Sequence, residues 1–156
     1  MADSRKSWMV GALVAGVFFA FFIGVRVHLQ ARLSAVHAMR DKDLPVTVKQ
    51  AAPIIAAIER YIEDHRKPPE SLASLMPKDL PQLPDAGPVA ENGWHYSTDV
   101  DEDAGGWTLL IWVRREYSDG PFTDRFVFRP SGNYPTDGYG GSLLAESSGE
   151  WAYYVE

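Results

Sequence analysis

The 156-residue sequence contains no cysteine, and this absence excludes several classes of protein at once. Without thiols there is no disulfide scaffold, no thiolate zinc or iron–sulfur centre and no cysteine nucleophile. The four histidines are scattered, and none lies three or four residues from another, so a helix-borne metal site is unsupported. Nucleophile-elbow, zinc-protease, P-loop and dinucleotide-binding motifs are also lacking. The sequence therefore predicts a non-enzymatic protein without a cofactor.

Basic side chains are scarce after position 40, where ten Lys and Arg accompany twenty Asp and Glu. Nucleic-acid binding requires clustered Lys and Arg that neutralise phosphates, so this acidic part argues against a nucleic-acid partner. Residues 1–40 have the opposite balance, with five basic side chains and one acidic. The net charge of −6 therefore combines a basic N-terminal part with an acidic C-terminal part.

Residues 7–25 lack charged side chains altogether and read SWMVGALVAGVFFAFFIGV. As a helix this run spans about 28 Å, close to the roughly 30 Å hydrocarbon core of a bilayer. It is longer than the apolar core of a signal peptide, and no small-residue cleavage site directly follows it, so an uncleaved signal anchor is favoured over a cleaved signal. Basic residues flank both ends, and charge alone therefore leaves the orientation open.

Small residues recur every four positions in this run and would form one ridge on the helix: Ala12, Gly16, Ala20 and Gly24. Such ridges allow the backbones of membrane helices to approach closely, which indicates a homo-oligomer formed through the helix. The simpler interpretation is that Gly and Ala are frequent in membrane helices.

The helical pattern continues beyond the membrane run and predicts three segments in the chain. Residues 1–25 form a basic tip and the anchor, 26–45 an amphipathic stalk with linker, and 46–156 a folded domain. The stalk would lie on lipid headgroups or pair with a neighbouring stalk, and Pro45 is expected to end or kink its helix. A second helix reaching His65 would bury one apolar stripe. The members of that stripe are Ile54, Ile55, Ile58, Tyr61 and Ile62.

From Trp94 the apolar residues alternate with a period of two, which is typical of half-buried strands. Three antiparallel strands are predicted near 94–97, 107–114 and 125–129, and residues 151–155 would add a short fourth. Helix first and strands afterwards predicts an α+β domain, in which one helix packs on one antiparallel sheet.

Carboxylates occupy alternate positions in the loop after the first predicted strand, at Asp99, Asp101 and Asp103. Crowded carboxylates before a glycine resemble the first half of a calcium loop, and a hard cation would relieve their repulsion. The remainder of that loop pattern is missing, because Leu110 stands where a bidentate Glu belongs. A solvated acidic turn is the preferred interpretation, and calcium binding is the alternative hypothesis.

Residues 130–149 are rich in Gly, Ser, Tyr and Asp and are expected to form a loop. Aromatic side chains in and beside this loop suit contacts with a protein partner. The candidate contact residues are Tyr134, Tyr139, Trp151 and Tyr153. The preferred alternative is that these rings cover the open face of the sheet.

Two segments carry a resemblance to a known family. Residues 58–65 read IERYIEDH, and residues 68–84 read PPESLASLMPKDLPQLP. Aromatic strands beginning GWHY at 93 and GWTL at 106 follow in order. Over residues 46–130 the chain resembles the pilin-like domain of bacterial type II secretion pseudopilins. That family's prepilin peptidase processing motif and its filament-registering glutamate have no counterpart between residues 5 and 25.

The resemblance implies a pilin-like domain displayed on a single-pass anchor in the bacterial inner membrane, with the domain in the periplasm. It implies a structural or assembly component of a secretion or pilus-type system, whose partners are the lipid bilayer and other envelope proteins. A true pseudopilin with a degenerate leader is one alternative. A membrane-tethered module that binds calcium or another ligand, unrelated to secretion, is the other.

Overall fold

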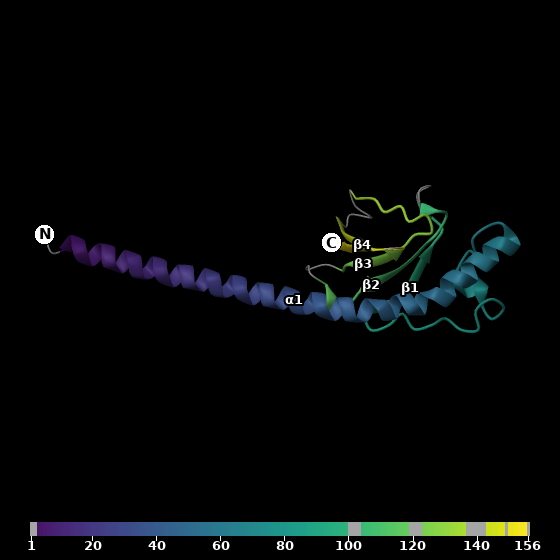
Figure 1. Ribbon diagram of the computed structural model, residues 1–156, viewed down its shortest axis with the longest axis horizontal. Helices are drawn as coiled ribbons and strands as arrows, with labels where there is room; N and C mark the ends of the chain where they lie inside the picture. The colour runs from purple at the N-terminus through teal and green to yellow at the C-terminus, as the bar shows by residue number, and fades with distance from the viewer. Residues whose placement is uncertain (1–2, 100–103, 119–122, 137–142, 149, 156) are drawn as a thin grey trace. The chain divides into compact units, whose positions relative to one another are not determined.

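The computed structural model describes residues 3–99, 104–118, 123–136, 143–148 and 150–155. The chain divides into two compact units, Met1–His37 and Ala38–Glu156. Helix α1, Asp3–His65, supplies the first unit and the beginning of the second. Figure 1 shows the strands of the second unit gathered beside the C-terminal part of this helix. The α+β prediction is therefore confirmed.

Helix α1 continues through Pro45, so the expectation that the helix ends there is wrong. A proline inside a helix removes one hydrogen bond and disfavours helical geometry at the preceding residue. Tertiary contacts on both sides offset this cost. The Tyr117 hydroxyl donates to Asp43 Oδ2 at 2.9 Å, and buried Thr47 donates from Oγ1 to the Ala86 carbonyl at 2.8 Å. Both contacts lie within the second compact unit, Ala38–Glu156.

The described strands form one antiparallel sheet in the order β1-β2-β3-β5-β4. Their bounds are Ala90–Ser97 for β1, Thr108–Val113 for β2, Arg125–Phe128 for β3, Leu143–Ser148 for β4 and Trp151–Val155 for β5. The three expected strands and the short fourth are confirmed. Strand β4 was expected to be loop, and this expectation is wrong. It pairs with β5 in a register that shifts between Leu144 and Glu146, so the regular alternation that reveals a strand is interrupted there.

One face of the sheet packs against α1 and forms the core. The predicted helical stripe is confirmed, because Ile54 and Ile58 are fully buried and Ile55, Tyr61 and Ile62 are half-buried against the same core. Its partners are alternate residues of the strands and their flanks. They are Trp107, Leu109, Ile111, Val113, Phe126, Phe128, Trp151 and Tyr153.

The connection from α1 to β1 is held by aromatic side chains of β1. Tyr96 donates its hydroxyl to the Pro69 carbonyl at 2.9 Å, and the indole N–H of Trp94 donates to the Pro84 carbonyl at 2.9 Å. Within this connection, residues Leu72–Leu75 form the 3₁₀ helix η1, which buries Leu75. Met76 follows this helix in an extended conformation and is exposed.

Candidate functional site

The acidic loop after β1 is described only at its beginning. Asp99 is exposed, and its backbone N–H donates to Ser97 Oγ at 3.1 Å. Asp101 and Asp103 lie outside the described residues. Among the residues that are described, no three His, Asp or Glu side chains gather as metal ligands would. Calcium binding stays a prediction, and a thermal melt that is unchanged by millimolar calcium would contradict it.

The small-residue ridge lies on α1, and only its C-terminal half has described surroundings. Ala20 is exposed, and a Cβ added at Gly24 would meet no atom within 4 Å. The side-chain surroundings of Ala12 and Gly16 lie outside the described part of the chain. This surface is open in the single chain, as close approach of a second helix would require, and self-association stays a prediction.

The aromatic residues proposed as partner contacts divide into two groups. Trp151 and Tyr153 retain only 5% and 3% exposure and belong to the core, which leaves little of either ring for a partner to contact. Tyr134 is half-buried, and its hydroxyl accepts from the Arg129 N–H and donates to the Glu150 carbonyl. Tyr139 lies outside the described residues.

Buried charged groups meet at the edge of this core. The guanidinium carbon of Arg40 lies 4.1 Å from the ring centroid of Tyr153, and the Tyr153 hydroxyl donates to Asp124 Oδ2 at 2.7 Å. Arg40 and Asp124 are both buried. Burial raises the pKa of Tyr153 far above its usual value, the Asp124 carboxylate raises it further, and the Arg40 cation partly opposes this. The Tyr153 hydroxyl therefore stays protonated, and the contact of the ring with Arg40 joins β5 to α1 as a structural interaction.

The opposite face of the sheet has a covered part and a more accessible part. Val127, Ala152 and Tyr154 are fully buried there, with Leu110 and Tyr134 packed against them. Further toward β1, three partly buried side chains gather on neighbouring strands: His95, Trp112 and Arg125. We call these three residues the outer-face cluster.

Within the outer-face cluster, the indole ring of Trp112 lies between two groups of basic character. The guanidinium carbon of Arg125 lies 4.5 Å from the Trp112 ring centroid. The imidazole of His95 meets the same ring edge-on, with 6.0 Å between the centroids. Trp and Arg are enriched at the energetic centres of protein interfaces. Alternation in the sequence placed all three residues on one face, but only the pairing of Trp112 with Arg125 brings them together.

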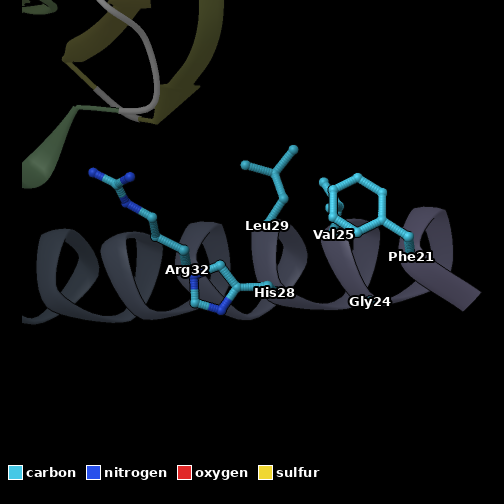
Figure 2. Close-up of a pocket in the computed structure, with 6 residues that line it drawn as sticks. All are labelled: Phe21, Gly24, Val25, His28, Leu29 and Arg32. Carbon is cyan, nitrogen blue, oxygen red and sulfur yellow. The ribbon is translucent and has the colours of Figure 1, made fainter.

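The N-terminal unit contributes a site of a different kind. Within the described residues, the helical segment Phe18–His65 is long and apolar enough, in an 18-residue window, to cross a membrane, and none of that window is buried. A shallow groove follows one face of the helix there (Figure 2). It is lined by Phe21, Gly24, Val25, His28, Leu29 and Arg32.

No protein-family model matches the chain, and no curated protein or solved structure matches it either. Function is therefore inferred from the residues and geometry described above. Among the described residues, that geometry leaves two features to consider, namely the exposed apolar segment of α1 and the outer-face cluster.

Proposed function

We propose that this chain is a single-pass membrane protein that displays a pseudopilin-like domain as a structural or assembly component of a bacterial secretion or pilus-type system. The observation that supports this proposal most is that the two parts of α1 have different surroundings. Its N-terminal part exposes apolar side chains such as Phe18 and Phe22, whereas its C-terminal part buries Ile54 and Ile58 under an antiparallel sheet. A helix with this division both anchors a domain and contributes to its core.

We propose the outer-face cluster as the partner surface, in place of Trp151 and Tyr153, whose rings are buried. A partly buried indole between a guanidinium and an imidazole suits a protein partner that presents apolar and carboxylate groups.

The side of the membrane on which the domain lies is the first test. We expect protease added to spheroplasts of a bacterium that expresses the full chain to digest the domain, which would place it in the periplasm. The control is a cytoplasmic protein that stays intact in the same sample. A domain that is protected until the membrane is lysed would overturn the secretion or pilus assignment.

The mass of the chain isolated from membranes tests a second point. Intact Met1–Glu156 is the outcome expected for a signal anchor. A chain shortened at its N-terminus would instead favour a true pseudopilin with a degenerate leader.

The outer-face cluster also favours the alternative, a membrane-tethered binding module unrelated to secretion. A photoreactive amino acid at position 112 distinguishes the two functions in cells. Cross-links to filament or secretion-platform subunits are expected from the proposed function. Cross-links confined to proteins outside such systems would favour the binding module.

A further inference from the structure

The face of α1 that packs on the domain changes its chemistry part-way along the helix. Its members recur at spacings of three and four, so they form one stripe. The first part of the stripe is polar, with Arg40 and Thr47 buried and Asp43 partly buried. Leu44 adds one partly buried apolar side chain there. The buried members of the second part are all apolar: Ala51, Ile54, Ala57 and Ile58.

The polar part of the stripe is held by contacts that water can replace. Its partners are the rings of Tyr153 and Tyr117, the latter through its hydroxyl, and the carbonyl of Ala86. One hydrogen bond of this kind favours docking by only about 2- to 12-fold. The buried Arg40 cation adds little, because desolvation of a buried charge offsets much of its attraction to its partners. Water does not compensate for lost apolar contacts in this way, so the second part is held more firmly.

Prolines weaken the helix at the same place. Pro53 lies just after the stripe changes from polar to apolar, and it has no N–H to donate to the Lys49 carbonyl. Pro45 removes the corresponding bond to the Asp41 carbonyl within the polar part. Sharp bends in helices occur mostly at proline. The helix is therefore easiest to bend where its attachment to the domain changes.

We propose that residues 40–50 form a strap that detaches from the domain and docks again, with Pro53 as its hinge, while residues 54–62 keep the core closed. The detached strap adds roughly 16 Å of helix between the apolar run and the core. Detachment does not depend on the function proposed above, but its use does. In a membrane-anchored chain, the strap would let the domain extend from its anchor toward a partner.

The lack of cysteine permits a direct test, because one introduced thiol is then the only thiol in the chain. Thr47→Cys places it in the strap, and Ala57→Cys places it at an equally buried position of the apolar part. The full chain in detergent micelles is labelled with a maleimide. Urea denaturation of each variant gives the labelling rate expected if only global unfolding exposes the thiol. We expect Ala57→Cys to label at that rate, and Thr47→Cys at least tenfold faster than its own global rate.

Two hydroxyl deletions separate detachment from global unfolding. Tyr96→Phe removes the bond to the Pro69 carbonyl, which persists when the strap detaches. It should therefore speed labelling at position 57 about fivefold and leave position 47 unchanged. Tyr117→Phe removes the bond to Asp43, which is lost in detachment and in unfolding alike. It should speed labelling about fivefold at both positions.

Hydrogen exchange of the unchanged chain checks that the introduced sulfur does not itself cause detachment. A short helical segment that contains a proline is not stable by itself in water, so the detached strap should lose its helical hydrogen bonds. We expect the amides of residues 46–50 to be at least tenfold less protected than those of residues 54–58.

Three results would overturn the strap. The first is labelling of both thiols at their global rates, and the second is equal acceleration at positions 47 and 57 by Tyr96→Phe. The third is equal protection of the two groups of amides. Extraction of the unchanged chain from membranes by alkaline carbonate would instead overturn the anchoring and the use of the strap as a tether. Labelling in micelles tests detachment in either case, so the two failures are distinguishable.

Discussion

The two units of this chain use the same kind of side chain in opposite ways. In the N-terminal unit Phe18 and Phe21 are 60% and 66% exposed, whereas Trp107 in the domain is 2% exposed. The difference follows from how the apolar residues are distributed. Residues 7–25 are uncharged on every side of the helix, so no face is distinguished for packing in water. The domain strands alternate, so one face of the sheet can be buried while the other stays accessible.

Charged groups show the same contrast. In the N-terminal unit Arg26 and Arg32 are exposed beyond the apolar run, where headgroups and water can solvate them. In the domain, Arg40 and Asp124 are buried and contact the ring and the hydroxyl of Tyr153. A buried charge is tolerated only with such partners. The exposed apolar side chains and flanking arginines of the N-terminal unit thus suit a bilayer with its headgroups, whereas the domain suits water around a closed core.

The largest effect is expected from removing a buried ring of the domain. Trp107→Ala deletes a side chain that lies 5.4 Å from the Phe128 ring and 6.1 Å from the Tyr96 ring, centroid to centroid. We expect the free energy of unfolding to fall by about 3–5 kcal/mol. Urea unfolding of the full chain in detergent micelles, followed by near-ultraviolet circular dichroism, measures this. The control Phe22→Ala removes an exposed ring and should leave the transition unchanged.

A charge in the apolar run should produce the next largest effect, now confined to the other unit. Phe18→Arg places a cation near the middle of the segment and costs about 3 kcal/mol of membrane insertion. We expect most of the chain to become extractable from membranes by alkaline carbonate. Phe18→Leu should remain in the membrane pellet. Retention of Phe18→Arg in the pellet would mean that the run does not cross a bilayer.

The buried polar contact of the domain should have an intermediate effect. Tyr153→Phe removes the hydroxyl that donates to Asp124 and leaves that carboxylate buried with one donor fewer. We expect a loss of about 1–3 kcal/mol in the free energy of unfolding. The matched control is Tyr154→Phe, which removes an equally buried ring's bond to the Pro135 carbonyl, a neutral acceptor. A larger loss in the control would show that Asp124 does not depend on Tyr153.

Alkaline pH tests the same contact by favouring deprotonation of the tyrosine hydroxyl. Burial raises the pKa of Tyr96 and of Tyr134 to about 12, and the pKa of Tyr153 is raised in the same direction. A pKa raised by folding stabilises the protonated state, so this stability is complete below pH 10 and decreases as the pH rises toward the folded values. Denaturation at several pH values measures the decrease. We expect a shallower decrease in Tyr153→Phe, and an unchanged slope would contradict the assignment.

Most of the fold is predictable from periodicity, because α1's buried stripe and strands β1, β2, β3 and β5 each repeat an apolar pattern over several residues. Periodicity does not reveal β4, whose pairing with β5 is interrupted by a register shift. The rule for proline predicts a helix end at Pro45, because that rule considers only neighbouring residues. The contacts of Asp43 and Thr47 that offset the cost of the proline come from distant segments.

The sites are less predictable than the fold for a related reason. Exposed and buried aromatic residues are indistinguishable by type, so Tyr153 resembled a contact residue until its neighbours were known. The outer-face cluster and the Arg40–Tyr153 contact each join residues from different elements. The groove at Gly24 is the exception, because all of its lining residues lie within twelve positions of one helix and can be found by spacing alone.

The smallest effect on stability is expected at Trp112, which lies on the face of the sheet away from the core. Trp112→Ala removes a partly buried side chain whose contact with Arg125 is worth about 0.5–1 kcal/mol at an accessible site. The free energy of unfolding should therefore change by about 1 kcal/mol, far less than for Trp107→Ala, although the same residue type is removed from the same strand region. Cross-linking to a partner from a neighbouring outer-face position should nevertheless be lost. A destabilisation as large as that of Trp107→Ala would mean that the outer face is a second core rather than a surface, and the proposed partner contact would have to lie elsewhere.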